Sequence, residues 1–179
     1  MYKRSIAAAA LYFSVVGPVA AQAPFGSEED VAYAATLWER LARFNLHGRT
    51  QINTVPYDGQ HPHGAVLETL EGVIQVGDDV GAVIVKRNYG GEGATKASVA
   101  NDRAKYLGAV TVMFRRPGYD PDNANWFWAK YLPDGSLDKN PMGVPLAGRV
   151  AKGMAEGCIA CHEAAPGGDY VYNHDRYAK

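Results

Sequence analysis

The chain has 179 residues, which is enough for one ordinary domain and excludes two domains of full size. Its content of 47% hydrophobic and 21% charged residues is that of a globular protein and excludes a collagen-like or fully disordered chain. The 18 Lys and Arg balance 19 Asp and Glu, whereas a nucleic-acid-binding protein would show a basic excess.

The first 21 residues have the pattern of a secretory signal peptide. Lys3 and Arg4 precede an apolar run at 6–16, and residues 19–21 are the small residues after which a signal peptidase cleaves. The run is too short to span a bilayer comfortably, although an uncleaved membrane anchor is the alternative. We therefore expect a periplasmic protein with one domain over residues 22–179 and no transmembrane segment after cleavage.

An amphipathic helix is predicted next. Ser27 is a suitable N-cap, and the three acidic residues after it complement the helix dipole. The residues that recur at helical spacing up to Gly48 are Val31, Ala34, Ala35, Trp38, Leu41, Ala42 and Asn45. The polar stretch that follows, with its prolines and glycines, is predicted to be a loop.

Four segments rich in Val, Ile, Thr and aromatic residues predict strands at 65–76, 80–89, 107–116 and 125–132. Turn-forming residues separate them, and most of the gaps hold no helical pattern that could make a parallel crossover. An antiparallel meander is therefore expected. With a last helix predicted over 145–163, the fold class is α+β, a mainly antiparallel sheet with an N-terminal and a C-terminal helix.

The last predicted helix carries the motif C-x-x-C-H at residues 158–162. Positions i and i+3 share one helix face, so Cys158 and Cys161 can both reach the two vinyl groups of one haem. His162 then lies where it can ligate the iron from the proximal side. The motif predicts one covalently attached haem c, bound by both cysteines and His162, on a C-terminal haem-attachment helix. Such attachment occurs outside the bacterial cytoplasm, in agreement with the signal peptide.

Three other interpretations of the cysteines remain open. A redox C-x-x-C pair would open a helix after a strand of a βαβ unit, whereas these cysteines are predicted late in a helix. A disulfide between them would have poor geometry within one helix. A zinc site could use His174, but no second histidine follows it.

The order of several segments makes the chain similar to the cytochrome P-460 family, whose β-sheet relatives include the cytochromes c-prime-beta. The segments are AVIVK at 82–86, VMFRRPGYD at 112–120, NWFWAKY at 125–131, GCIACH at 157–162 and DYVY at 169–172. They are spread over residues 82–172, which is more than half of residues 22–179. The resemblance implies a single haem domain with an antiparallel sheet and flanking helices, which in this family often forms a homodimer.

In enzymatic members of this family a lysine is cross-linked to the porphyrin and the haem oxidises hydroxylamine. The resemblance assigns this catalytic and cofactor-binding role to Lys86, on the strand face that it shares with Ala82 and Ile84. The alternative is a strand lysine that points into solvent.

Enzymatic members also carry a distal carboxylate in the strand that matches 107–114. This strand contains neither Asp nor Glu, so the base that would take protons from hydroxylamine is missing there. Glu68 or Glu71 in the preceding strand could replace it if either faced the iron. An apolar distal wall instead favours small uncharged ligands such as nitric oxide or carbon monoxide.

The sixth coordination position of the iron is left open by the sequence. The candidates are His61, His63, Met113 and Met142. Met154 is expected on the proximal side, because it precedes Cys158 by four residues on the predicted helix. Side chains that could contact the haem or its propionates, or else pack or face solvent, are Trp126, Phe127, Trp128, Arg115, Arg116 and His174.

Two function classes follow. In the first, an exported monohaem cytochrome transfers electrons with a periplasmic redox partner or binds a small ligand such as nitric oxide. In the second, an oxidoreductase converts hydroxylamine or a related small nitrogen compound at a haem cross-linked to Lys86. The missing strand carboxylate favours the first class.

Overall fold

The computed structural model describes residues 25–172, so the expected signal peptide at 1–21 and His174 lie outside the described residues. One six-stranded sheet dominates it, and every neighbouring pair of strands is antiparallel, in the order β1-β2-β3-β4-β5-β6. The strands are β1 (Tyr57–Asp58), β2 (Val66–Val76), β3 (Asp79–Tyr89), β4 (Leu107–Arg115), β5 (Trp126–Tyr131) and β6 (Ala147–Gly148). The predicted antiparallel meander is confirmed.

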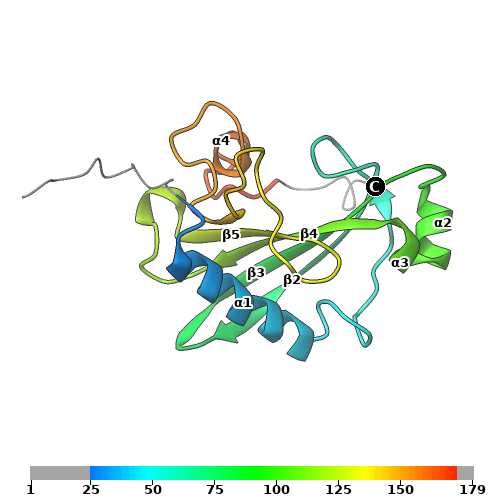
Figure 1. Ribbon diagram of the computed structural model, residues 1–179, viewed down its shortest axis with the longest axis horizontal. Coiled ribbons are helices and arrows are strands. Elements are labelled where there is room, and N and C mark those ends of the chain that lie inside the picture. The colour runs from blue at the N-terminus through cyan, green and yellow to red at the C-terminus, as the bar shows by residue number, and fades with distance from the viewer. Residues whose placement is uncertain (1–24, 173–179) are drawn as a thin grey trace, which may run out of the picture.

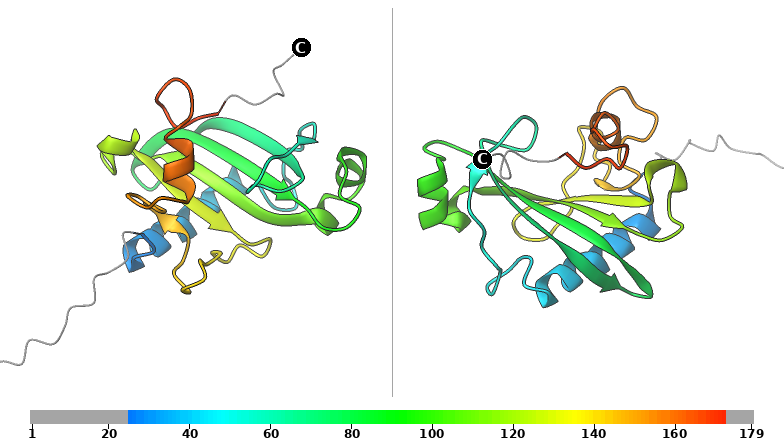
Figure 2. Two further views of the ribbon diagram at one scale, coloured as in Figure 1. Left: turned by 90° about the horizontal axis from the view of Figure 1, so that it is seen from above. Right: turned by 180° about the vertical axis from the view of Figure 1, so that it is seen from behind.

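The helices cover both faces and one end of the sheet. They are α1 (Glu28–Arg43), α2 (Lys96–Asn101), α3 (Arg103–Tyr106), the 3₁₀ turn η1 (Pro121–Asn123) and α4 (Cys158–His162). In Figure 1, α1 lies across one face, α4 and its flanking segments lie over the other, and α2 and α3 lie together at one end. Figure 2 shows the same division from above and from behind. The α+β class, with a helix near each end of the described chain, is confirmed.

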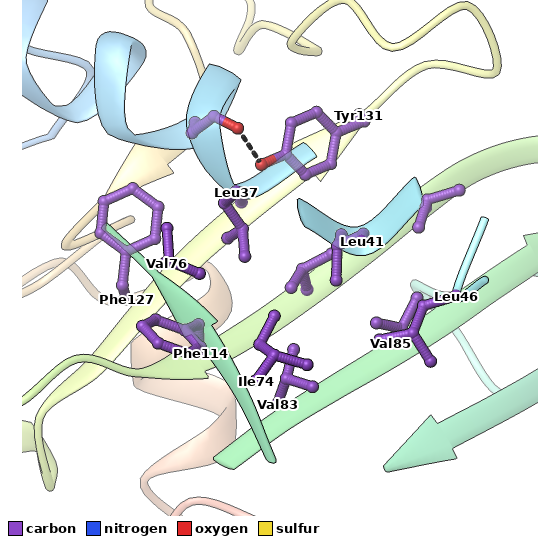
Figure 3. Close-up of a cluster of buried hydrophobic side chains, with 14 of the residues drawn as sticks. Leu37, Leu41, Leu46, Ile74, Val76, Val83, Val85, Phe114, Phe127 and Tyr131 are labelled. Atoms are coloured by element: carbon purple, nitrogen blue, oxygen red, sulfur yellow. Dashed lines mark hydrogen bonds between the residues drawn. The ribbon is translucent and has the colours of Figure 1, made fainter. Parts of the chain in front are cut away.

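The N-terminal helix begins at the predicted cap. The Ser27 hydroxyl accepts a hydrogen bond from the Asp30 backbone N–H at 3.1 Å. The buried positions of α1 are Asp30, Ala34, Leu37 and Leu41. The buried face of the helix therefore includes Leu37, which the predicted spacing left out, whereas Ala35, which it included, is exposed. Figure 3 shows Leu37 and Leu41 packed against inward side chains of the sheet, such as Val83 and Phe114.

Side chains of β3 alternate between the two faces of the sheet. Val83 and Val85 join the core beneath α1, whereas Ala82 and Ile84 pack in a second cluster with Trp128 and Ile159. The sheet therefore has one face filled by α1 and an opposite face covered by the C-terminal segment.

The predicted helix over 145–163 is wrong in extent. Ala147 and Gly148 form strand β6, and only Cys158–His162 is helical. Gly148, Ala151, Gly153 and Gly157 all have positive φ, which a right-handed helix cannot contain. Among the helices of the described chain, none has both the length and the apolar character needed to cross a membrane.

Candidate functional site

A cavity of about 920 Å³ lies on the sheet face opposite α1. Its size is within the range of about 300–1,000 Å³ that is usual for sites that bury a small ligand or cofactor. The wall is built by alternate residues of β3, β4 and β5, by the turn before β2, and by α4. The lining residues used below are Ile84, Lys86, Asn88, Ala109, Thr111, Met113, Trp128, Lys130, His61, His63, Cys158, Cys161 and His162.

The chain enters α4 through a tight turn that only glycine fits. Gly157 has φ of +131°, and a Cβ atom on it would lie 2.2 Å from the Cβ atom of Ala151. The helix then begins directly at Cys158, and not several turns earlier as predicted. Cys158 and Cys161, at i and i+3, are both free thiols that line the cavity, the first half-buried and the second exposed.

The thiol of Cys158 is not activated as a redox thiol would be. Burial raises its pKa above the ordinary value, whereas redox C-x-x-C motifs lower the pKa of the attacking thiol. The strands of the sheet are all antiparallel, so the βαβ unit of that alternative is also missing from the described chain. These two observations count against the redox interpretation.

His162 is held with one ring nitrogen directed toward the backbone. Its Nδ1 lies 2.7 Å from the carbonyl oxygen of Tyr170, so Nδ1 carries a proton and donates it. Burial lowers the pKa of the ring below its ordinary value, and the imidazole is therefore neutral. A neutral ring whose Nδ1 donates to a carbonyl has its Nε2 lone pair available, which is the form that ligates a metal ion.

Lys86 does not point into solvent. It is only 8% exposed, it lines the cavity, and its positive charge contributes to the lowered pKa of His162. The structure thus brings Lys86, Cys158, Cys161 and His162 to one cavity. Their assigned roles stay predictions.

These residues fit an iron porphyrin held through two thioethers and one imidazole. The cavity offers two thiols on one helix face and a neutral imidazole one residue beyond. The indole Nε1 of Trp128, buried in the wall, has no hydrogen-bond partner among the described residues, so a polar atom of a bound group could accept from it. Among residues 25–172 no three His, Cys, Asp or Glu side chains are grouped to hold a metal ion by themselves. The zinc alternative would need His174.

The β4 part of the wall carries no carboxylate. Its lining side chains include Ala109, Thr111 and Met113, and Glu156 is the one acidic residue that the described cavity wall contains. Glu71 is exposed and lies outside the wall.

Glu68 faces the opposite side of the sheet from the cavity. Its fully buried carboxylate accepts hydrogen bonds from Arg87 at 3.2 Å and from the Tyr89 hydroxyl at 2.6 Å. Arg103 donates a third, at 2.9 Å. Neither Glu68 nor Glu71 replaces the missing distal carboxylate.

The candidates for a sixth iron ligand differ in whether they line the cavity. His61, His63 and Met113 line the cavity, while Met142 is 77% exposed and lies outside it. Met154 lines the cavity rim at 46% exposure, and it precedes α4 instead of lying on it.

The other predicted haem contacts are mostly engaged elsewhere. Trp128 lines the cavity, but Trp126 donates from Nε1 to the carbonyl of Asp169 at 2.7 Å and Phe127 lies in the α1 core. Arg115 stacks over the Trp126 ring, and Arg116 pairs with Asp79. Neither arginine lines the cavity.

Sequence reasoning missed several wall residues, namely Asn88, Thr111, Lys130 and Glu156. The first three could have been found from strand alternation, because they share the face of Lys86 or lie directly across from it in the ladder. No sequence pattern points to Glu156, which lies in an irregular loop.

A family model described as Cytochrome P460 matches residues 73–173. This is more than half of the chain, and it runs from within β2 beyond α4, so it includes Lys86, both cysteines and His162. The turn that carries His61 and His63 precedes the matched residues. No curated protein and no solved structure matches the chain.

Proposed function

This chain belongs to the cytochrome P460 family, and from that membership we infer that it is a haem-binding cytochrome. We propose that it is an exported, monohaem c-type cytochrome that transfers electrons or binds a small uncharged ligand such as nitric oxide. The observation that carries the proposal is the common cavity of Cys158, Cys161 and His162, whose wall on β4 has no carboxylate.

The chain's own residues would hold the group as follows. Cys158 and Cys161 would each hold the haem through a thioether, formed by addition of the S–H group across one vinyl C=C bond with nothing released. His162 would ligate the iron through Nε2, because its Nδ1 donates to the Tyr170 carbonyl oxygen. The bound haem supplies a one-electron redox centre and a coordination position for a small ligand.

The wall of the cavity decides between binding and proton-transfer chemistry. Ala109, Met113 and Trp128 give part of the cavity an apolar wall, and no carboxylate stands on β4 to take a proton from a bound nitrogen compound. This supports electron transfer or capture of an uncharged ligand.

The test is to produce the full chain in a bacterium that matures c-type cytochromes and to look for haem that survives denaturing electrophoresis. We expect covalent haem in the wild type and about one haem per chain by pyridine haemochrome assay. The double variant Cys158→Ser/Cys161→Ser should carry none. A wild-type protein without covalent haem would overturn the proposal.

One observation favours a second candidate, an oxidoreductase that acts on hydroxylamine or a related nitrogen compound. Lys86 is almost fully buried in the cavity wall, where the family resemblance assigns a lysine cross-linked to the porphyrin. Forming that N–C bond removes one N–H and one C–H hydrogen, so a two-electron oxidant of the peroxide class must accept them.

Mass spectrometry of the haem peptides tests this candidate. A cross-link joins the peptide that contains Lys86 to the peptide that contains the C-x-x-C-H motif, and Lys86→Arg separates them. Lys130→Arg is the matched control, since Lys130 also lines the cavity from a strand. A wild-type haem peptide that contains only the motif segment would rule the cross-link out.

The remaining parts of the proposal concern location and partners. We propose cleavage after Ala21, a periplasmic location for residues 22–179, a periplasmic redox partner and formation of a homodimer. Cell fractionation with N-terminal sequencing tests the first two, and sedimentation of the matured protein tests the homodimer.

A further inference from the structure

The side chain of His63 lies directly beside the ring of His162. The two ring centroids are 6.0 Å apart and the ring planes are nearly perpendicular, at 87°. Both rings line the large cavity and also a neighbouring one of about 280 Å³. His63 comes from the turn before β2 and His162 from α4, so the two rings approach from opposite elements of the fold.

The turn that carries His63 is anchored to the sheet. The backbone N–H of His63 donates to the Gln60 carbonyl at 2.8 Å, which closes the turn. At its base, the Ala65 N–H donates to the Tyr89 carbonyl at 3.0 Å. Gly64 has φ of +105°, and a Cβ atom on it would lie 2.7 Å from the Tyr89 oxygen, so the turn sits tightly on the end of β3.

The separation of the rings is compatible with two imidazoles on a single metal ion, although two rings in direct edge-to-face contact lie at a similar distance. A metal–imidazole bond is about 2.0 Å long, and the ring centroid lies about 1 Å beyond the nitrogen, so opposite rings have centroids about 6 Å apart. Side chains that only contact a porphyrin stay about 3.5 Å from its plane on each side, which requires a wider gap. Perpendicular ring planes are compatible with two rings that stand upright on opposite sides of one iron.

We propose that His63 is the second axial ligand of the haem iron, opposite His162. The inference rests on the proposed haem binding and deepens it. The other candidates are less suited, because Met142 is exposed and His61 makes no ring contact with His162 in the described structure. Met113 also lines the cavity, but its side chain is packed in the buried apolar cluster of the sheet. His63 also precedes the residues matched by the family model, so the assignment does not rest on that match.

The consequence is a six-coordinate, low-spin iron. Such a centre transfers electrons with little rearrangement, because both ligands stay in place. An external ligand of the nitric oxide or carbon monoxide class binds only when His63 leaves the iron, so its binding rate is limited by dissociation of His63.

The experiment compares matured wild-type protein with His63→Ala and with His61→Ala as the matched control from the same turn. Absorption and electron paramagnetic resonance spectra give the spin state, and stopped-flow mixing with carbon monoxide gives the binding rate. We expect low-spin iron in the wild type and in His61→Ala. His63→Ala should become high-spin, bind carbon monoxide at least tenfold faster, and return to low-spin when imidazole is added.

Several outcomes would overturn the proposal. High-spin iron in wild-type protein that carries covalent haem would do so without any variant, and the proposed haem binding would stand. A low-spin spectrum that His63→Ala leaves unchanged would assign the ligand to another residue. A wild-type chain that takes up no haem would overturn the haem binding and the ligation together.

Discussion

Glu68 and Arg87 form a fully buried ion pair between neighbouring strands. The Arg87 guanidinium also donates to the carbonyls of Leu46 and Ile52, both at 2.8 Å. Through these two hydrogen bonds, Arg87 holds the segment after α1 against the sheet. Its charges lie on the face opposite the cavity, and so we assign it to the stability of the fold and not to the chemistry of the site.

Replacing one partner of this pair should be costly. Glu68→Gln leaves the Arg87 charge buried without its carboxylate, and breaking a buried pair in this way lowers the free energy of unfolding by about 3–5 kcal/mol. Glu71→Gln, at an exposed position of the same strand, should change it by less than about 0.5 kcal/mol. Urea denaturation of both variants measures the difference, and equal values would contradict the assignment.

His47 should make the stability depend on pH. It stacks on Trp38, with ring centroids 3.6 Å apart, and its Nε2 donates to the Trp38 carbonyl. Burial lowers the pKa of its ring below the ordinary value. The unfolded chain, whose histidine pKa is about 6.5, then binds more protons than the folded chain as the pH falls. The contribution of neutral His47 is complete above that pKa and is lost as the pH falls through the folded pKa.

Unfolding in urea at several pH values between about 8 and 5 checks this. The wild type should lose more stability on acidification than His47→Gln, whereas His61→Gln, at an exposed position, should follow the wild type. If the free energy of unfolding fell equally with pH in all three proteins, His47 would not contribute to the pH dependence of stability.

At the scale of elements, the entry into α4 decides where the C-x-x-C-H motif lies. Gly157 combines a positive φ with a Cβ position 2.2 Å from Ala151, so any side chain there must displace the turn. Gly157→Ala should lower the free energy of unfolding by about 1–3 kcal/mol and reduce the yield of covalent haem. Gly72→Ala is the control, because nothing lies within 4 Å of a Cβ there. A normal yield of covalent haem in Gly157→Ala would show that haem attachment does not depend on the conformation of this turn.

At the scale of the whole molecule, the two faces of the sheet differ in how they are filled. The α1 face has a core of buried side chains that includes Leu37, Val85 and Phe127 (Figure 3). The opposite face has a smaller cluster around a cavity of about 920 Å³. The packing of the α1 face is complete without haem, whereas we expect the packing of the opposite face to depend on what occupies the cavity.

Hydrogen exchange of the Cys158→Ser/Cys161→Ser protein should show this difference. Without attached haem, the segment over 149–172 should exchange much faster than in the matured wild type, because its apolar cluster with the sheet then borders an unfilled cavity. The backbone of α1 and of the central strands should stay protected in both proteins. Equal loss of protection on both faces would show that the sheet also needs the haem.

The sequence predicted the regular elements well where a single local rule governs them. Strand alternation and turn residues located β2 to β5, and the Ser27 cap located α1. The prediction of a helix over 145–163 was wrong, because the spacing of apolar residues does not reveal the positive φ angles at Gly148 and Ala151. At Gly148 the tertiary packing also leaves no room for a side chain, because a Cβ atom there would lie 2.4 Å from the Asp30 carboxylate.

The sequence by itself determined the family, the antiparallel meander and the C-x-x-C-H motif, because each depends on patterns within short segments of the chain. Only the tertiary structure decided which face each distant residue occupies. It turned Glu68 away from the cavity, buried Lys86 in its wall, and placed His63 beside His162, about one hundred positions later in the chain. Such contacts are decided by the packing of separate elements across the sheet, and no local spacing of residues encodes them.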